Sequence, residues 1–284
     1  MFLFIKIIII IMVIIAITAG IIYTANRFFN KRVDEEIREL FKNVSSTVKK
    51  TITRSDLEDL PAPVKKWLEF AGVVGKEKIS LVRLKQKAEM KLEKEKTWMP
   101  VEAEQYFTVN PPGFIWKAKI KAAPFFHIVG RDKYFNGKGN MQIKILSLFT
   151  VADSSGKEMD QGTLLRYLAE TVWFPSAVLS DYIRWEEVDN KTAKATMNFE
   201  GTTATGIFYF SDEGYVMNFE AERYKETDEE YSLETWSVDM NEYKNMDGFM
   251  IPSKGEVTWK LNDGDFTWYS FEIVDIEYGK TEPY

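Results

Sequence analysis

Three carboxylates stand close together in residues 151–170, and they are the side chains in this chain best placed to do chemistry. Asp153, Glu158 and Asp160 could form a paired acid and base, or could offer oxygen ligands to a hard cation such as calcium. Their spacing does not match an EF-hand loop, and Asp160 or Thr163 is well placed to cap the helix that follows. We therefore favour helix capping within a solvated loop, and predict no metal site and no cofactor.

Other catalytic constellations are missing from the sequence. The chain has one histidine, His127, which lies in an apolar run, and it has no cysteine. A serine–histidine triad would need this histidine, and a single histidine cannot build the usual zinc site. Neither a glycine-rich phosphate loop followed by a helix nor a Gly-x-Ser-x-Gly elbow occurs. We predict no catalytic residues, and a hydrolase built on the three carboxylates remains an alternative.

The aromatic content points to apolar binding instead. Phe, Tyr and Trp make up 14% of the chain, and such side chains either fill a core or line a cavity for an apolar ligand. Both explanations stay open here. If a cavity exists, Tyr106, Trp116 and Trp173 are our candidates for its lining, together with Arg166. Arg166 also stands four residues before Glu170, which permits an ion pair on one helix face.

An uncharged stretch at residues 7–23 contains ten isoleucines among its seventeen residues. At about 1.5 Å of rise per residue, a helix of this length just crosses a bilayer core of about 30 Å. The apolar run is longer than that of most signal peptides, although cleavage is an alternative. We predict a single-pass anchor over residues 1–25, with the large domain outside the cytoplasm. The basic residues on the two flanks are nearly balanced, so they do little to decide the orientation.

A basic, amphipathic helix is expected next, over residues 26–54. Apolar residues recur there at helical spacing from Val33 to Ile52 and form one stripe. Nine Lys/Arg against four Asp/Glu give residues 1–54 a net charge of +5, which leaves −11 for the remainder of a chain whose total is −6. A strongly acidic domain is a poor partner for nucleic acid, so we predict no nucleic-acid binding.

Residues 55–284 have the pattern of a single antiparallel β domain. About twelve runs of alternating residues are separated by turn sequences such as Asn136-Gly137 and Asp263-Gly264. The main helical interruption is expected at about residues 161–179. The predicted fold is mainly β (α+β), a large curved antiparallel sheet or open half-barrel with an inserted helix, preceded by the transmembrane helix.

A set of short motifs resembles a bacterial domain-of-unknown-function family of single-pass membrane proteins. The motifs include Leu-Pro-Ala-Pro-Val at 60–64, Ala-Glu-Gln-Tyr-Phe at 103–107, Pro-Pro-Gly-Phe-Ile-Trp at 111–116 and Trp-Phe-Pro-Ser-Ala at 173–177. The resemblance covers roughly residues 60–278 and carries no catalytic residues. It implies a β domain similar to the lipoprotein carriers LolA and LolB, which hold acyl chains in a hydrophobic cleft. Unlike LolB, this chain has no cysteine to lipidate.

Three functions remain open at this point. The preferred one is a membrane-tethered module that binds a lipid or another apolar ligand. The second is an interaction or sensor domain of the cell envelope, with a protein partner on the sheet or the juxtamembrane helix. The third is the carboxylate-dependent hydrolase. A continuous apolar cavity beside the inserted helix would favour the first.

Overall fold

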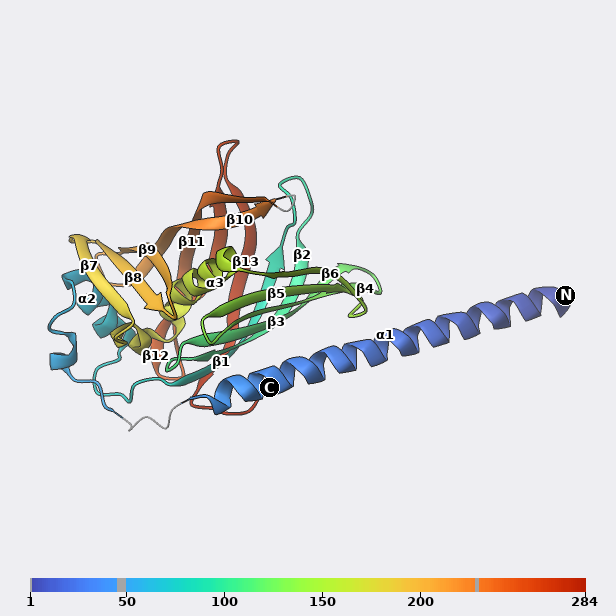
Figure 1. The fold of residues 1–284 in the computed structure, drawn as a ribbon, viewed down its shortest axis with the longest axis horizontal. Helices are drawn as coiled ribbons and strands as arrows, with labels where there is room; N and C mark the ends of the chain where they lie inside the picture. Colours follow the sequence, from blue (N-terminus) through green and yellow to red (C-terminus); the bar gives the residue numbers. More distant parts are fainter. Residues whose placement is uncertain (1, 45–49, 228–229) are drawn as a thin grey trace.

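The protein is one curled antiparallel sheet wrapped around a helix, with a second, long helix projecting from it (Figure 1). The computed structural model describes residues 2–44, 50–227 and 230–284. In this part of the chain thirteen strands form a single sheet, in the order β6-β5-β4-β3-β2-β1-β13-β12-β11-β10-β9-β8-β7. The predicted half-barrel with an inserted helix and a long apolar N-terminal helix is confirmed.

The strands follow the alternation and turn signals of the sequence for most of their length. The strands are β1 (Leu81–Met90), β2 (Met99–Thr108), β3 (Gly113–Ala123), β4 (Phe126–Phe135), β5 (Lys138–Ile145), β6 (Phe149–Ser155), β7 (Ile183–Asp189), β8 (Thr192–Phe199), β9 (Thr202–Phe210), β10 (Val216–Thr227), β11 (Glu230–Met246), β12 (Phe249–Lys260) and β13 (Phe266–Tyr278). Strands β5 and β6 divide residues 141–150, which the alternation predicts as one strand. They turn at Leu146 and Ser147, both with positive φ.

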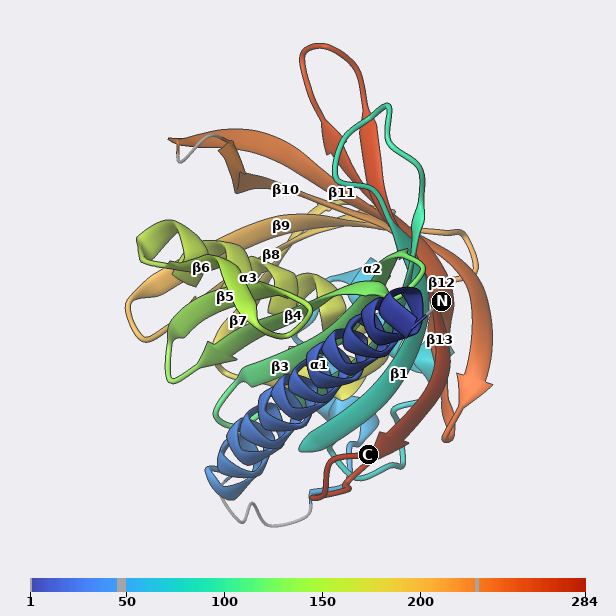
Figure 2. The same cartoon turned by 90° about the vertical axis from the view of Figure 1, so that its right-hand side faces the viewer.

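Helix α3 (Lys157–Glu170) links the two edges of the sheet. The chain builds β1 to β6 as a meander, passes through α3, and starts again at the opposite edge with β7. The final strand, β13, then pairs with β1 and joins the two halves. Helix α3 contacts β4, β5 and β6 on one side and β8, β9 and β10 on the other. Figure 2 shows it lying inside the curl of the sheet, where it fills part of the interior.

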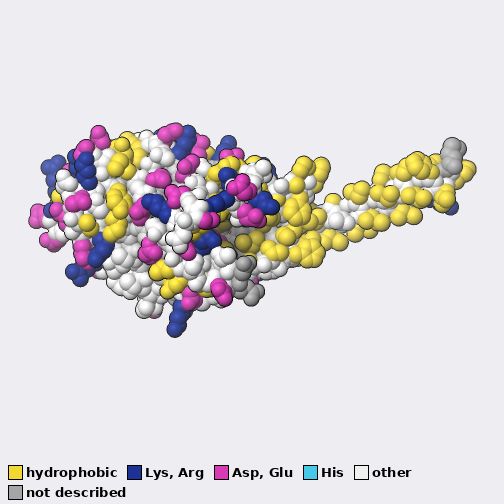
Figure 3. Space-filling model, turned by 90° about the horizontal axis from the view of Figure 1, so that it is seen from above, with side chains coloured by type: hydrophobic (Ala, Val, Ile, Leu, Met, Phe, Trp, Pro, Cys, Tyr) yellow, Lys and Arg dark blue, Asp and Glu magenta, His cyan; other side chains and the backbone are white. Residues whose placement is uncertain are grey.

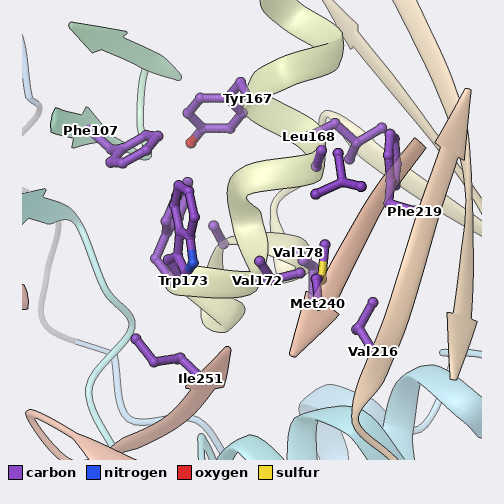
Figure 4. Close-up of a cluster of buried hydrophobic side chains, with 14 of the residues drawn as sticks. Phe107, Tyr167, Leu168, Val172, Trp173, Val178, Val216, Phe219, Met240 and Ile251 are labelled. Atoms are coloured by element: carbon purple, nitrogen blue, oxygen red, sulfur yellow. The ribbon is translucent and has the colours of Figure 1, made fainter. Parts of the chain in front are cut away.

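The helical insertion differs in detail from the prediction over residues 161–179. Helix α3 begins earlier, at Lys157, and ends at Glu170. Two short 3-10 turns, η2 (Thr171–Trp173) and η3 (Pro175–Leu179), complete the segment, since Pro175 cannot continue an α-helix. These turns bring Val172, Trp173 and Val178 into a buried cluster with Phe107 and Tyr167 (Figure 4).

One end of the curl is covered by α2 (Ala62–Ala71), which follows a short 3-10 turn, η1 (Arg54–Leu57). Trp67 is the central contact of α2: it is 1% exposed and packs against Trp185, Phe208 and Phe210. The helix ends at Gly72, whose φ of 72° is the left-handed conformation that glycine adopts readily. Trp67 and its three partners thus form an aromatic cluster beneath α2.

Helix α1 (Phe2–Lys42) has two different halves. The first carries residues 7–23 and has the length and composition of a membrane span, properties that a signal sequence shares. The second half packs on the convex face of the sheet through Phe29, Val33, Ile37, Leu40 and Phe41, against β1 to β4. The helix ends at Lys42, short of the predicted stripe. Ile52 is buried in an extended segment instead, and residues 45–49 lie outside the described part.

Ion pairs fix the second half of α1 to the sheet. Asp34 lies 3.2 Å from the Lys117 ammonium on β3, and Glu36 lies 3.2 Å from the Arg131 guanidinium on β4. Arg131 is almost fully buried by this contact. Because apolar packing and charge pairing act on the same helix face, the orientation of the projecting half is set by the domain itself.

Candidate functional site

A cavity of 460 Å³ lies between α3 and the concave face of the sheet. Strands β1, β3, β4, β5 and β10 to β13 contribute to its wall, and its lining is mainly apolar. Five of the chain's eight tryptophans take part: Trp116, Trp173, Trp236, Trp259 and Trp268. Aromatic enrichment of this kind, in a space of this size, is typical of sites for small apolar molecules.

The helix presents one face to this cavity at helical spacing. Glu158, Gly162, Arg166 and Glu170 follow one another at four-residue intervals along α3 and line the cavity with Met159, Ala169 and Trp173. The other face of α3, including Leu164, Leu165 and Leu168, is fully buried in the core. One face of α3 therefore packs in the core, and the other provides polar side chains to the cavity.

A buried ion-pair network holds α3 against the sheet. Arg166 donates to Glu170 at 2.8 Å and to Asp132 on β4 at 2.6 Å. The guanidinium also lies over the rings of Phe114 and Trp116. Burial raises the pKa of Glu170 above its usual range, although Arg166 opposes this rise. The predicted pair between Arg166 and Glu170 thus forms, and its third member comes from the sheet.

Two glutamines continue the network into the wall of the cavity. Gln105 on β2 donates from its amide nitrogen to Glu170 at 2.7 Å, and Gln86 on β1 donates to Gln105 at 3.3 Å. The Gln86 carbonyl in turn accepts from the Trp116 indole at 3.3 Å and from the Tyr269 hydroxyl at 2.9 Å. Each of these polar side chains has a hydrogen-bonding partner, so the network serves to position the wall of the cavity.

Arg223 on β10 differs from the members of the Arg166 network, each of which has a hydrogen-bonding partner. Its guanidinium lies 4.8 Å from the Trp236 ring and 5.8 Å from the Trp259 ring. Its Nε is buried, and within the described residues it has no hydrogen-bond acceptor and no ion-pair partner. Burial, followed by repulsion from Arg166, lowers the pKa of Arg223 to about 10. The side chain is therefore still a cation at neutral pH.

Three of the four candidate lining residues from the sequence, Trp116, Arg166 and Trp173, line the cavity. The fourth, Tyr106, does not. It lies on the convex face of β2, fully buried beneath α1, and its hydroxyl donates to Glu104 at 2.8 Å. Alternation along the strand explains this placement, because Tyr106 and Gln105 must point to opposite faces.

The three carboxylates do not form one cluster. Asp153 on β6 is exposed and accepts from Asn140 and Gln142, which lowers its pKa. Glu158 lines the cavity at the start of α3. In the described part of the chain no group of three or more His, Asp or Glu side chains is placed to hold a metal ion.

Asp160 has a different role from the predicted helix cap. Helix α3 begins after Gly156, and the Asp160 side chain accepts from the Gly139 backbone N–H at 2.7 Å and from Lys138 at 2.8 Å. A side chain at Gly139 would collide with the Met159 carbonyl, so the start of α3 lies directly on β5. Thr163 does not cap either, because its hydroxyl donates back to the Met159 carbonyl. The expectation that Asp160 or Thr163 caps α3 is wrong.

Sequence reasoning missed Arg223 and the two glutamines. A signal was present for two of them, because Phe219, Ala221 and Arg223 alternate on one face of β10, and Gln86 lies between the inward residues Leu84 and Ala88 of β1. A charged or amide side chain in an inward register is costly to bury without a partner. Such residues are therefore candidates for a site even without a motif.

The fold is similar to several solved structures of low sequence identity. A LolA superfamily protein from Nitrosomonas europaea shows 10% identity and a TM-score of 0.40, over 81% of this chain and 94% of that chain. A DUF1329 family protein from Desulfovibrio piger shows 9% identity and a TM-score of 0.43, over 77% and 92%. A proposed outer membrane lipoprotein-sorting protein domain from Vibrio parahaemolyticus shows 8% identity and a TM-score of 0.42, over 71% and 86%.

No functionally curated protein matches the sequence. A protein family does match, and its match extends over the whole sheet apart from the end of β13. The matched region, residues 50–271, includes α2, the cavity wall and α3, and is well over half of the chain. The chain therefore belongs to DUF6544, a family of unknown function.

Proposed function

We propose that this protein is a membrane-tethered binding module that encloses an apolar ligand, such as a lipid acyl chain, between α3 and the sheet. The observation that carries the proposal is the cavity of 460 Å³ with its five tryptophans. Its volume falls within the range of about 300–1,000 Å³ usual for small-molecule sites. No catalytic step is part of the proposal, because Asp160 is occupied in holding α3 on β5 and Asp153 is occupied by two amides.

The tether is the projecting half of α1, which we propose remains uncleaved and crosses the membrane, with the domain outside the cytoplasm. Side chains along this half are exposed, as expected for a surface that meets lipid (Figure 3). Since the same helix continues into Phe29, Val33 and Ile37, which are buried on the sheet, the domain is held beside the bilayer without a loose linker.

Exposed aromatic side chains support this placement. Phe125 and Phe126 lie at the β3–β4 turn and Phe149 starts β6, and all three are exposed. The neighbouring β5–β6 turn touches α1, because the Ser147 hydroxyl donates to the Asn26 side chain at 3.2 Å. Asn26 follows the apolar stretch by three residues, about 4.5 Å of helix. Figure 3 shows apolar side chains gathered where the domain meets the helix, and we propose that they lie at the membrane interface.

We predict that Phe125 lies at the lipid interface. The chain has no cysteine, so Phe125→Cys provides a single labelling site for an environment-sensitive fluorophore. In phospholipid nanodiscs, spin-labelled lipids should quench this fluorophore strongly. The matched control is Val188→Cys, at an exposed position on the edge strand β7, where little quenching is expected. Equal quenching at the two sites would contradict the proposed placement.

The ligand proposal is tested by tryptophan quenching in the full-length chain. The probe is the methyl ester of stearic acid brominated at mid-chain, added to the protein in zwitterionic nanodiscs. None of the eight tryptophans lies in α1, and five line the cavity, so occupancy should quench most of the emission in a saturable way. Unbrominated ester should reverse it. Quenching that only rises linearly with the probe would reject the proposal.

A further inference from the structure

The cavity contains a set of hydrogen-bond donors that share one chemical character. Four described residues that line it have a buried polar atom without a partner: Arg223 through Nε, and Trp173, Trp236 and Trp268 through their indole nitrogens. All four atoms are N–H donors. A buried donor without an acceptor is destabilising. Because these polar groups of the wall are donors, they favour a ligand that brings acceptor oxygens as well as an apolar part.

The charged side chains in the interior do not all form ion pairs. The charges of Arg166, Asp132, Glu170 and Arg223 sum to zero, but both of these carboxylates already bind Arg166, and Glu170 also binds Gln105. Glu158, at the start of α3, adds a further carboxylate to the lining, and among the described residues it forms no ion pair with Arg223. Arg223 has only the faces of Trp236 and Trp259 beside it. At the rim, Lys225 donates to Thr227, while Glu226 accepts from Ser154 and Tyr231. None of these described carboxylates lies within ion-pair distance of Arg223.

The position of Arg223 suits the polar end of an elongated ligand. Gly162 of α3 faces it, and a Cβ at Gly162 would lie 3.4 Å from Nε, so the helix covers one side of the guanidinium with backbone alone. The rings of Trp236 and Trp259 cover another. Beyond them the wall continues as Val238, Met240 and Val257, which are apolar. A cation without an ion pair thus lies next to a stretch of wall that is suited to a hydrocarbon chain.

We propose that Arg223 binds the anionic carboxylate or phosphate headgroup of an amphiphile whose hydrocarbon chain occupies the cavity. The guanidinium has five N–H donors in a planar fork, which matches the paired oxygens of either group. The indole nitrogen of Trp236, whose ring lies beside Arg223, is a further donor without a partner in the described residues. This inference rests on the proposed function, and it specifies the class of ligand: an acidic lipid in preference to a neutral one.

The test compares charged and neutral probes on the full-length protein in zwitterionic nanodiscs. Two pairs share their brominated chains: stearate with its methyl ester, and phosphatidic acid with diacylglycerol. Wild-type protein should bind at least one anionic probe about tenfold more tightly than its neutral partner, as expected for a charge-assisted hydrogen bond. The pair that shows the preference identifies carboxylate or phosphate as the headgroup.

Variants at Arg223 decide the assignment. Arg223→Gln should lose this preference while binding the neutral probes as before, and Arg223→Lys should keep part of it because it keeps the charge. Arg184→Gln, an exposed change on β7, is the matched control and should behave as wild type. Unchanged thermal unfolding of each variant shows that it has folded, and the lysine variant separates loss of charge from loss of structure.

The outcomes separate the two proposals. If wild type binds charged and neutral probes equally, or if Arg223→Gln retains the preference, the headgroup assignment is overturned and the apolar-ligand function stands. If wild type binds none of the four probes, the apolar-ligand function itself fails, and the headgroup assignment fails with it.

Discussion

Replacing Arg166 by methionine is expected to lower the free energy of unfolding by about 3 kcal/mol at neutral pH, because it leaves buried carboxylates without their cation. Methionine keeps an unbranched apolar stem at this position but not the guanidinium that lies over the rings of Phe114 and Trp116. Glu170 would retain only the amide of Gln105, and Asp132 would lose its charge partner. Urea unfolding of the full-length protein in detergent micelles, followed by tryptophan fluorescence, measures the loss.

The pH dependence of that loss has a definite sign. Burial already raises the pKa of Glu170 in the folded protein, and removing Arg166 removes the group that opposes this rise. A folded pKa above the unfolded value means that protonation favours the folded state. The deficit of Arg166→Met relative to wild type should therefore be complete above the raised folded pKa of Glu170. The deficit should shrink as pH falls toward 4.5, the ordinary pKa of a glutamate side chain.

A double variant checks the same cause independently. Adding Glu170→Gln to Arg166→Met removes the stranded charge and should recover a substantial part of the lost stability. Arg184→Met, at an exposed site on β7, should change stability by less than about 0.5 kcal/mol. A deficit that stays constant with pH and is not relieved by Glu170→Gln would mean that lost packing, not unpaired charge, explains the effect.

The architecture could be predicted because two local signals agree over most of the chain. Period-two alternation in segments such as 98–109 and 203–210 marks strands, and Asn-Gly or Asp-Gly pairs mark the turns between them. The signal fails at β5 and β6. Their hairpin turns through Leu146 and Ser147, which both adopt a positive φ. Neither residue is glycine or asparagine, the types that usually mark such a turn, so the alternation predicts one continuous strand.

The site was less predictable than the fold, for a physical reason. The cavity depends on how far the sheet curls and on where α3 lies across it, and neither property is local in sequence. Residue type predicts Trp116, Arg166 and Trp173 as lining residues, and these three line the cavity. Residue type predicts Tyr106 as well, but Tyr106 faces α1, because one step of strand register reverses the face. Asp160 was expected to cap a helix, but it joins that helix to β5.

Filling the cavity from its wall is expected to abolish ligand binding without unfolding the protein. Ile143 on β5 lines the cavity and pairs with Gly130 on β4, which has no side chain to crowd a larger neighbour. The Trp116 ring lies over Gly130, where a Cβ would be 3.4 Å from it, so in Ile143→Trp the new indole must extend into the cavity itself. Filling an open cavity differs from overpacking a filled core, which costs about 1–3 kcal/mol. We expect a change in stability of less than about 1 kcal/mol.

The binding loss should be large because the indole and the ligand compete for the same volume. We expect at least about a tenfold weaker affinity for the brominated methyl ester, measured by tryptophan quenching in nanodiscs. The matched control is Lys144→Trp, one residue along β5, which adds the same ring on the opposite face of the strand. Lys144→Trp should bind the ester as wild type does. If Ile143→Trp also binds normally, the ligand lies elsewhere and the cavity beside α3 is not its site.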